Sequence, residues 1–148
     1  MRNVIILDLD GVLITTPSWK ADLVHLDGYS AFNEKCVDYF NLLETNAEIW
    51  LSSTRRTRKS LVEFKEIFKN RNVFKDLTGF IPNIQRNRNE EIKYFLELNK
   101  NIKNYLIIDD DITLSGYYSN KEWTQTLPLL GFTNEKYLEA SKIIKCWT

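Results

Sequence analysis

The stretch VIILDLDG, residues 4–11, decides the fold of this chain. Its first four residues are all aliphatic and do not alternate with polar residues, which is typical of a short strand buried on both faces of a sheet. Asp8 and Asp10 then end the apolar run, and Gly11 follows them. Strands buried on both faces occur mainly in parallel sheets that are covered by helices, so this stretch indicates an α/β architecture.

Short apolar runs and longer segments with helical spacing alternate along the rest of the chain. The predicted strands are residues 4–7, 48–51, 73–81, 105–108 and 123–127. The predicted helices are residues 32–44, 57–69, 89–99 and 134–147. Because strands alternate with helices, we expect an α/β fold in which helices cover a mainly parallel central sheet.

Length and composition limit the possible classes of protein. The chain has 148 residues, the length of one domain, and we expect a single domain over residues 1–148. Its 20 basic and 20 acidic side chains cancel, so the whole molecule has no net attraction to nucleic acid or to an anionic membrane. It has no apolar run of about 20 residues, the length that a membrane helix requires. Two cysteines, Cys36 and Cys146, do not form a disulfide framework, so we expect reduced thiols and a cytoplasmic location.

Polar clusters follow three of the predicted strands, at the point where each strand ends. They are residues 8–11, 52–55 and 109–111. In open α/β sheets, ligands bind outside the carboxyl ends of the parallel strands. We therefore expect the three clusters to meet at one edge of the sheet and to form a site there.

The acidic residues of these clusters indicate a metal site. Asp8 and Asp10 point the same way, because side chains alternate along a strand with a period of two, and Asp109 or Asp110 adds a third carboxylate. Crowded carboxylates raise one another's pKa values, and a divalent cation such as Mg²⁺ removes this conflict. A single pair of acids after a strand is more often a helix cap or a turn. Acids after two strands, with hydroxyls after a third, favour the metal site.

Residues 4–13, VIILDLDGVL, resemble the first motif of the haloacid dehalogenase (HAD) superfamily of phosphohydrolases, in which hydrophobic residues precede Asp-x-Asp-Gly. Residues 49–52 are similar to the second motif, a hydrophobic strand that ends in Ser or Thr. Asp109 and Asp110, which follow another apolar run, are similar to the fourth, acidic motif. The order of the motifs agrees, and the resemblance covers nearly the whole chain. It implies a three-layer, Rossmann-like domain.

The resemblance also implies a catalytic role for several residues. Asp8 would be the nucleophile that attacks phosphorus, and Asp10 would be the general acid and then the general base. Ser52 would donate a hydrogen bond to a phosphoryl oxygen. Gly11 belongs to the same first motif and is a candidate substrate-binding residue. Three residues next to Ser52 are further substrate-binding candidates: Ser53, Thr54 and Arg55.

The third motif of the superfamily requires one basic residue near a helix start. Arg88 fits this place best, and Arg86 and Lys93 are the alternatives. The charge of this residue would neutralise both the phosphoryl group and the nucleophile.

The fourth motif implies the metal ligands. Asp109 and Asp110, together with Asp8 and the main-chain carbonyl of Asp10, would hold Mg²⁺. Many members of the superfamily place the second acid a few residues further on, but residues 113–115 of this chain are Thr, Leu and Ser. The version with adjacent acids must therefore apply, and Asp111 is an additional candidate.

A separate cap domain does not fit into the chain. Only residues 12–30 and 56–87 are available for an insert, and the second segment must already hold a helix and a strand. The chain therefore resembles the capless branch, whose open sites commonly act on phosphorylated proteins or nucleic acids, and residues 12–30 would be a flap over the site. Residues 51–55 and 108–111 are similar to HAD-like domains associated with RNA end repair.

Basic residues near the second and third motifs favour a phosphate-binding patch, because guanidinium groups bind phosphates with paired hydrogen bonds. They are Arg55, Arg56, Arg58, Lys59, Arg86 and Arg88. The alternative is an ordinary solvated first turn of a helix. Trp19 and Tyr29 of the flap are expected either to stack on a base or to pack on the core, and His25 is not expected to be catalytic.

These observations predict a Mg²⁺-dependent phosphohydrolase that cleaves a phosphomonoester through an aspartyl-phosphate intermediate, with nucleic-acid ends as a candidate substrate. One alternative is a phosphatase of small metabolites or nucleotides. The other is a non-catalytic phospho-acceptor or metal-binding regulatory domain, similar to response-regulator receivers. Receivers lack the Asp-x-Asp-Gly arrangement after the first strand, which counts against this alternative.

Overall fold

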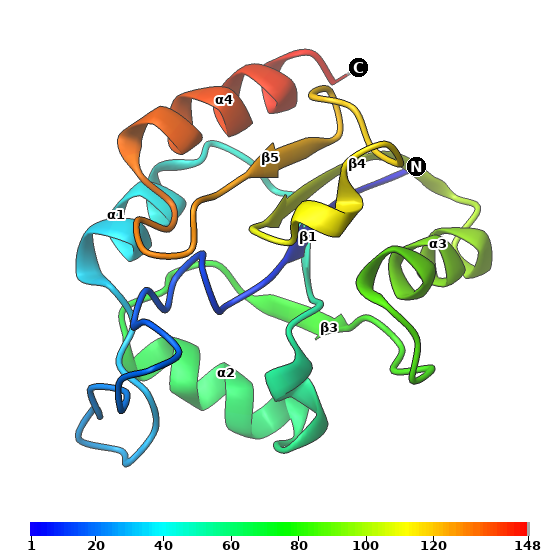
Figure 1. Ribbon diagram of the computed structural model, residues 1–148. Coiled ribbons are helices and arrows are strands. Elements are labelled where there is room, and N and C mark those ends of the chain that lie inside the picture. The colour runs from blue at the N-terminus through cyan, green and yellow to red at the C-terminus, as the bar shows by residue number, and fades with distance from the viewer. Residues whose placement is uncertain (148) are drawn as a thin grey trace.

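The computed structural model describes residues 1–147 and contains alternating strands and helices (Figure 1). The strands are β1 (Arg2–Leu7), β2 (Glu48–Leu51), β3 (Leu77–Phe80), β4 (Ile102–Asp109) and β5 (Trp123–Gln125). The α-helices are α1 (Glu34–Leu42), α2 (Leu61–Asn70), α3 (Arg88–Leu98) and α4 (Asn134–Lys145). The short 3₁₀ helices η1 (Thr54–Thr57) and η2 (Ile112–Leu114) follow the ends of β2 and β4.

The strands form one sheet in the order β3-β2-β1-β4-β5, and every neighbouring pair is parallel. The predicted α/β fold with a parallel central sheet is therefore confirmed. β1 is the central strand, and residues 4–7 have no exposed surface. The aliphatic run that opens the chain thus forms the centre of the sheet, as its lack of alternation predicts.

The register of the sheet aligns the ends of the three central strands. Leu7 of β1 lies opposite Leu51 of β2 and Ile108 of β4. The next residues along the three strands are Asp8, Ser52 and Asp109. These three polar residues therefore leave the sheet at the same level, which is the condition for a common site.

Helices cover both faces of the sheet and complete three layers (Figure 1). Because side chains alternate along a strand, Ile5 and Leu7 belong to the core that α1, α2 and α4 cover, whereas Val4 and Ile6 pack in a second core with α3 and η2. No separate cap domain is evident within residues 1–147, as predicted.

Helix α2 begins at Leu61, later than the predicted start at residue 57. The Ser60 hydroxyl accepts a hydrogen bond from the Glu63 backbone N–H, and the Glu63 carboxylate accepts one from the Ser60 backbone N–H. This capping box sets the start of the helix. The basic run before it forms the separate turn η1.

The strand boundaries also differ from the prediction. β4 begins at Ile102 and not at residue 105. The polar residues Lys103 and Asn104 interrupt the apolar run, so the first part of the strand was not predicted. β3 and β5 are shorter than predicted. These differences move no residue of the expected site.

The predicted flap, residues 12–30, is held against the domain beside α2 (Figure 1). Two guanidinium nitrogens of Arg71 each lie 2.7 Å from a carboxylate oxygen of Asp27, and Arg71 also donates to the backbone carbonyls of Tyr29 and Ser30. The Arg71 side chain is only 2% exposed, and its hydrogen bonds hold the pKa of Asp27 well below its usual range. The segment is therefore an anchored loop.

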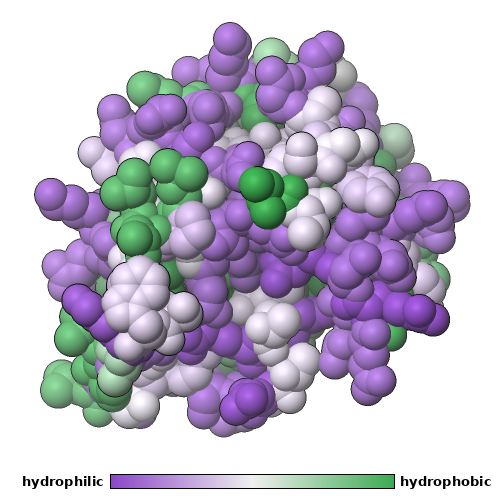
Figure 2. All heavy atoms as spheres, viewed as in Figure 1, coloured by the Kyte–Doolittle hydropathy of each residue, from purple (hydrophilic) through white to green (hydrophobic). Residues whose placement is uncertain are grey.

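Hydrophilic side chains cover most of the face seen in Figure 2, and hydrophobic side chains form only separate groups on it. Among the described helices, none is long and apolar enough to cross a membrane. Both cysteines within residues 1–147 are free; Cys36 is buried in the core, as its helical position predicts, and Cys146 is exposed. The cytoplasmic location remains a prediction from cysteine content.

We expect Arg71→Ala to lower the free energy of unfolding by about 2–4 kcal/mol, because it removes the ion pair with Asp27 and one hydrogen-bond donor from each of three backbone carbonyls. Urea unfolding measures this loss, and amide hydrogen exchange should accelerate in residues 22–30. Lys69→Ala removes an exposed charge from the last turn of α2, close to Arg71 in the chain, and is the control. Equal stability of the two variants would show that Arg71 does not anchor the loop.

Candidate functional site

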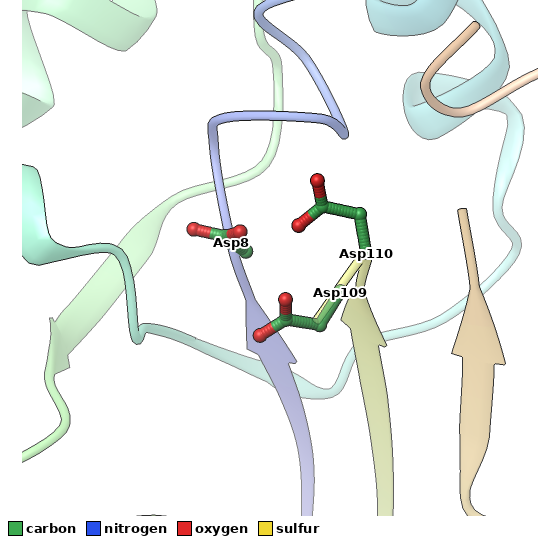
Figure 3. A group of neighbouring side chains, drawn as sticks. All are labelled: Asp8, Asp109 and Asp110. Carbon is green, nitrogen blue, oxygen red and sulfur yellow. The ribbon is translucent and has the colours of Figure 1, made fainter. Parts of the chain in front are cut away.

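Three carboxylates meet at the carboxyl end of the sheet, and Figure 3 shows them turned toward a common space. Asp8 follows the last residue of β1, Asp109 ends β4, and Asp110 is the next residue. Oxygen atoms of the three side chains lie within 4.8 Å of one another. Asp8 and Asp109 are buried and Asp110 is half-buried, so the cluster is largely shielded from water.

The surroundings of this cluster disfavour three negative charges. Burial raises the pKa of Asp8 well above its usual range, and the charge of Asp109 raises it further, against the opposing effect of Arg88. Burial likewise raises the pKa of Asp109. Burial and the charge of Asp109 together raise the pKa of Asp110 to about 6. The ion pairs of the described residues bring one guanidinium to the cluster, so part of the negative charge is left for a bound cation to balance.

The donors fit a hard divalent cation, because such ions bind carboxylate oxygens and water. Softer metals favour thiolate or imidazole ligands, and the cluster contains neither. Of the adjacent acids, Asp109 and Asp110 belong to the cluster and Asp111 does not. The Asp111 carboxylate instead accepts hydrogen bonds from the backbone N–H and the hydroxyl of Thr113, and so caps η2.

Because Gly11 has no side chain, the Asp110 carboxylate can lie directly beside its backbone. The φ of Gly11, +78°, lies in the left-handed region, and a Cβ atom at this position would lie 2.0 Å from the Asp110 Oδ2 atom. Its backbone N–H donates to the carbonyl of Ile14 at 2.8 Å. The structure thus gives Gly11 a steric role beside the acidic cluster, and substrate binding by this residue remains a prediction.

Ser52 brings a buried hydroxyl to the same end of the sheet. Ser52 is fully buried, and its Oγ atom has no hydrogen-bond partner among the described residues. A buried hydroxyl without a partner costs about 1–3 kcal/mol. Since the Ser52 backbone N–H donates to the carbonyl of Leu7 at 2.9 Å, this hydroxyl is held beside the residue that precedes Asp8. An acceptor on a ligand would satisfy it.

Arg88 is the basic residue that the structure places at the cluster. It is the first residue of α3, where Asn87 caps the helix. One of its terminal nitrogens lies 3.5 Å from Asp8 Oδ2 and forms an ion pair with Asp109. The two alternatives lie elsewhere: the Arg86 side chain is 67% exposed beside Glu90, and Lys93 is exposed on α3.

Asp10 lies apart from the three-acid cluster. Its side chain is 53% exposed, whereas that of Asp8 is 6% exposed. Both carboxylate oxygens of Asp10 accept hydrogen bonds from Arg55, at 2.8 and 2.9 Å. The expected acid–base residue is thus paired with an expected substrate-binding residue on the open side of the site. The metal contact expected for Asp10 concerned its main-chain carbonyl, and it remains a prediction.

Ser53 and Thr54 shape the turn after β2. The buried Ser53 hydroxyl accepts a hydrogen bond from the Arg55 backbone N–H at 3.2 Å and caps η1. Thr54 is exposed at the start of the turn. Substrate binding by these two residues remains a prediction.

The role of Arg56 was not predicted from the sequence. The prediction that Arg56 belongs to the basic patch is wrong. The Arg56 side chain is 3% exposed and pairs with Glu91 at 2.8 Å. It also donates to the backbone carbonyls of Ser52, Ser53 and Ile81. This network joins the loops after β2 and β3 to helix α3. The readable signal was an acidic residue, Glu91, on the apolar side of a helix, one residue before a buried isoleucine.

The remaining patch residues are more exposed. Arg58 is exposed, and the Lys59 ammonium lies 3.8 Å from Glu63 and 5.6 Å from the centre of the Tyr29 ring. Of the loop aromatics, Tyr29 packs edge-on against Phe64 of the core at 5.9 Å, so the packing alternative applies to it. Trp19 is 74% exposed. The patch is therefore smaller than predicted.

We expect Asp110→Asn to stabilise the metal-free protein by about 1–2 kcal/mol at pH 8, because it removes a repelled charge that solvent partly screens. Since the pKa of Asp110 is raised in the folded state, the free energy of unfolding of the wild type falls by this amount as the pH rises from about 4 to about 6. The gain should therefore disappear below about pH 4. Thermal unfolding at several pH values measures it.

The same substitution should abolish the rise in melting temperature that Mg²⁺ produces in the wild type, because it removes one of three carboxylate ligands. Asp111→Asn changes an adjacent acid outside the cluster and is the matched control, which should retain the Mg²⁺ effect. The reverse pattern in the two variants would place the cation elsewhere.

Comparison with known proteins agrees with this geometry. The profile of one protein family, described as the HAD domain in Swiss Army Knife RNA repair proteins, matches residues 4–137. No curated protein and no solved structure matches the chain significantly. The matched residues begin in β1 and include every member of the acidic cluster, together with Ser52 and Arg88. The chain therefore belongs to the family of HAD domains in Swiss Army Knife RNA repair proteins, in agreement with the superfamily that its motifs resemble.

Proposed function

We propose that this HAD domain is a Mg²⁺-dependent phosphatase that hydrolyses phosphomonoesters through an aspartyl-phosphate intermediate. One observation carries the proposal: Asp8 shares the end of the sheet with two more carboxylates, a guanidinium and a buried hydroxyl that has no hydrogen-bond partner within residues 1–147. Transfer of a phosphoryl group depends on such positioning and on the neutralisation of charge.

In the first step, a carboxylate oxygen of Asp8 attacks phosphorus, and the bond from phosphorus to the leaving oxygen breaks. The leaving oxygen takes a proton from Asp10 and departs as an alcohol. The Arg88 guanidinium, 3.5 Å from Asp8, balances charge on the phosphoryl group, and the Ser52 hydroxyl donates to one of its oxygens.

In the second step, water attacks the phosphorus of the aspartyl-phosphate and gives a proton to Asp10. Inorganic phosphate leaves, the Asp8 carboxylate is regenerated, and Asp10 is again protonated. Asp8, Asp109 and Asp110 would hold Mg²⁺, which when bound neutralises charge on the phosphoryl group.

We propose further that the substrate is a phosphorylated RNA end. The family is described by its place in RNA repair proteins. Within residues 1–147 no cap is inserted over the carboxyl end of the sheet, which suits a large substrate. The exposed Arg58 and Arg86 lie after η1 and before α3, in the connections at this end of the sheet, and guanidinium groups suit a phosphate backbone.

We expect Asp8→Asn to abolish the release of phosphate from p-nitrophenyl phosphate and to leave the circular dichroism spectrum unchanged. Asp10→Asn should lower kcat/KM for a phosphorylated oligoribonucleotide by about 10²–10⁴-fold, because the leaving oxygen then lacks its proton donor. EDTA should abolish the phosphatase activity of the wild type, and added Mg²⁺ should restore that activity. Full activity of the Asp8 variant would exclude the aspartyl-phosphate.

Substrate preference tests the proposed substrate. Oligoribonucleotides with a 3′- or 5′-phosphate should have a higher kcat/KM than mononucleotides and sugar phosphates, and this advantage should shrink as salt is added. A preference for the small substrates would support a metabolite phosphatase instead. Stable phosphorylation of Asp8 without turnover would support a regulatory domain.

A further inference from the structure

We infer that Arg55 is a positioning residue, which holds the Asp10 carboxylate on the open side of the site and joins it to the loop of residues 22–30. The inference rests on the proposed function, because Asp10 serves there as the general acid. Arg55 acts through Asp10 and not on the phosphoryl group itself.

All five N–H groups of the Arg55 guanidinium donate hydrogen bonds. Two of them bind the two oxygens of Asp10, at 2.8 and 2.9 Å. The others bind the Tyr29 hydroxyl at 3.2 Å, the Ser30 hydroxyl at 3.1 Å and the Asp22 carboxylate at 3.0 Å. A planar guanidinium that binds both oxygens sets the orientation of a carboxylate as well as its position.

The backbone of Arg55 is fixed on both sides. Its N–H donates to the Ser53 hydroxyl, and the next residue, Arg56, is buried in its ion pair with Glu91. The Arg55 side chain therefore extends from a turn that is bonded to the residue after β2, to the loop after β3 and to helix α3. Because its backbone is fixed in this way, the long Arg55 side chain can hold another group in place.

The loop supplies the other half of the arrangement. Asp22 pairs with Arg55 and also accepts a hydrogen bond from Ser30, and the Arg55 guanidinium lies 5.5 Å from the centre of the Tyr29 ring. The loop is itself anchored to α2 by the pair between Arg71 and Asp27. Asp10 is thus linked through Arg55 to a fixed part of the molecule.

The position of Asp10 suits a proton donor to the leaving group. The attacking and leaving oxygens of a transferred phosphoryl group lie roughly in line, so the leaving group departs on the side opposite Asp8. Because Asp8 is buried, that side is the open one, where the Asp10 side chain is 53% exposed. An exposed carboxylate samples several rotamers unless a partner holds it, and Arg55 is that partner.

The competing role is direct binding of a substrate phosphate by Arg55. Since every N–H of this guanidinium already has an acceptor, direct binding requires the loss of contacts to Asp10 or to the loop. The two roles predict different kinetics: direct binding changes mainly KM, whereas positioning of a general acid changes kcat/KM according to the leaving group.

The test compares two substrates with the full chain and its variants. An alcohol leaving group needs a proton, whereas p-nitrophenolate departs without one, and kcat/KM reports the steps up to this departure. We expect Arg55→Ala to lower kcat/KM by about 10²–10³-fold for a phosphorylated oligoribonucleotide, with a fall in kcat, and by less than about tenfold for p-nitrophenyl phosphate. Arg55→Lys keeps the charge but lacks the paired N–H groups. We expect it to show most of the same fall in kcat/KM for the oligoribonucleotide, with a smaller effect on p-nitrophenyl phosphate.

Two further variants separate positioning from folding. Lys65→Ala removes an exposed charge from α2 and should leave both values unchanged. Asp22→Asn keeps the pair between Arg55 and Asp10 and weakens only the loop contact, so we expect the same selective loss at about two- to tenfold. Unchanged kinetics of Asp22→Asn would exclude the loop from the arrangement.

The failure of the inference and that of the proposed function give different results. If the wild type hydrolyses neither substrate, the proposed function fails. If the wild type is active and Arg55→Ala loses kcat/KM equally for both substrates, or only raises KM for the oligoribonucleotide, Arg55 is not a positioning residue. Full recovery in Arg55→Lys would show that charge alone suffices and would also overturn the inference.

Discussion

Repulsion among three carboxylates is the constraint on which the site depends. Asp8 and Asp109 are nearly out of contact with water, and burial raises the pKa of both. Buried charges cost several kcal/mol unless partners compensate them. The charge of Arg88 compensates part of this cost. The apolar cores on the two faces of the sheet stabilise the fold and offset the remaining cost. A local cost of this kind is typical of a functional site, because a bound cation would balance the charge.

Two different devices hold the groups of this site. The backbone N–H groups of Asp8 and Ser52 donate to carbonyls of neighbouring strands at 3.0 and 2.9 Å, so these residues continue the hydrogen-bond ladder of the sheet. The Asp10 side chain lies beyond that ladder, and Arg55 holds it by a paired hydrogen bond. Asp8, the proposed nucleophile, is therefore as fixed as the sheet, whereas Asp10, the proposed acid–base residue, depends on η1 and on the loop of residues 22–30.

Local patterns predict the groups of the first kind. An aliphatic run that ends in a polar residue predicts both a buried strand and the point where it ends, and parallel topology brings such ends together. These patterns predict that Asp8, Ser52 and Asp109 lie at one edge of the sheet, and the register confirms it. The predicted start of α2 is wrong, although Ser60 and Glu63 form a capping box that sequence spacing can reveal.

Arg55 and Arg56 show what local patterns omit. They are adjacent in a basic run that is equally consistent with a solvated helix start, yet η1 directs one to Asp10 and the other into the interior. Their partners, Asp10 and Glu91, are 45 and 35 residues away in the chain, so no short pattern contains either pair. Both pairs join segments that come together only in the folded structure: the Arg55 pair connects η1 to the segment after β1, and the Arg56 pair connects η1 to α3. The strands thus bring the polar groups of the site together, and the two arginines hold the loops around those groups.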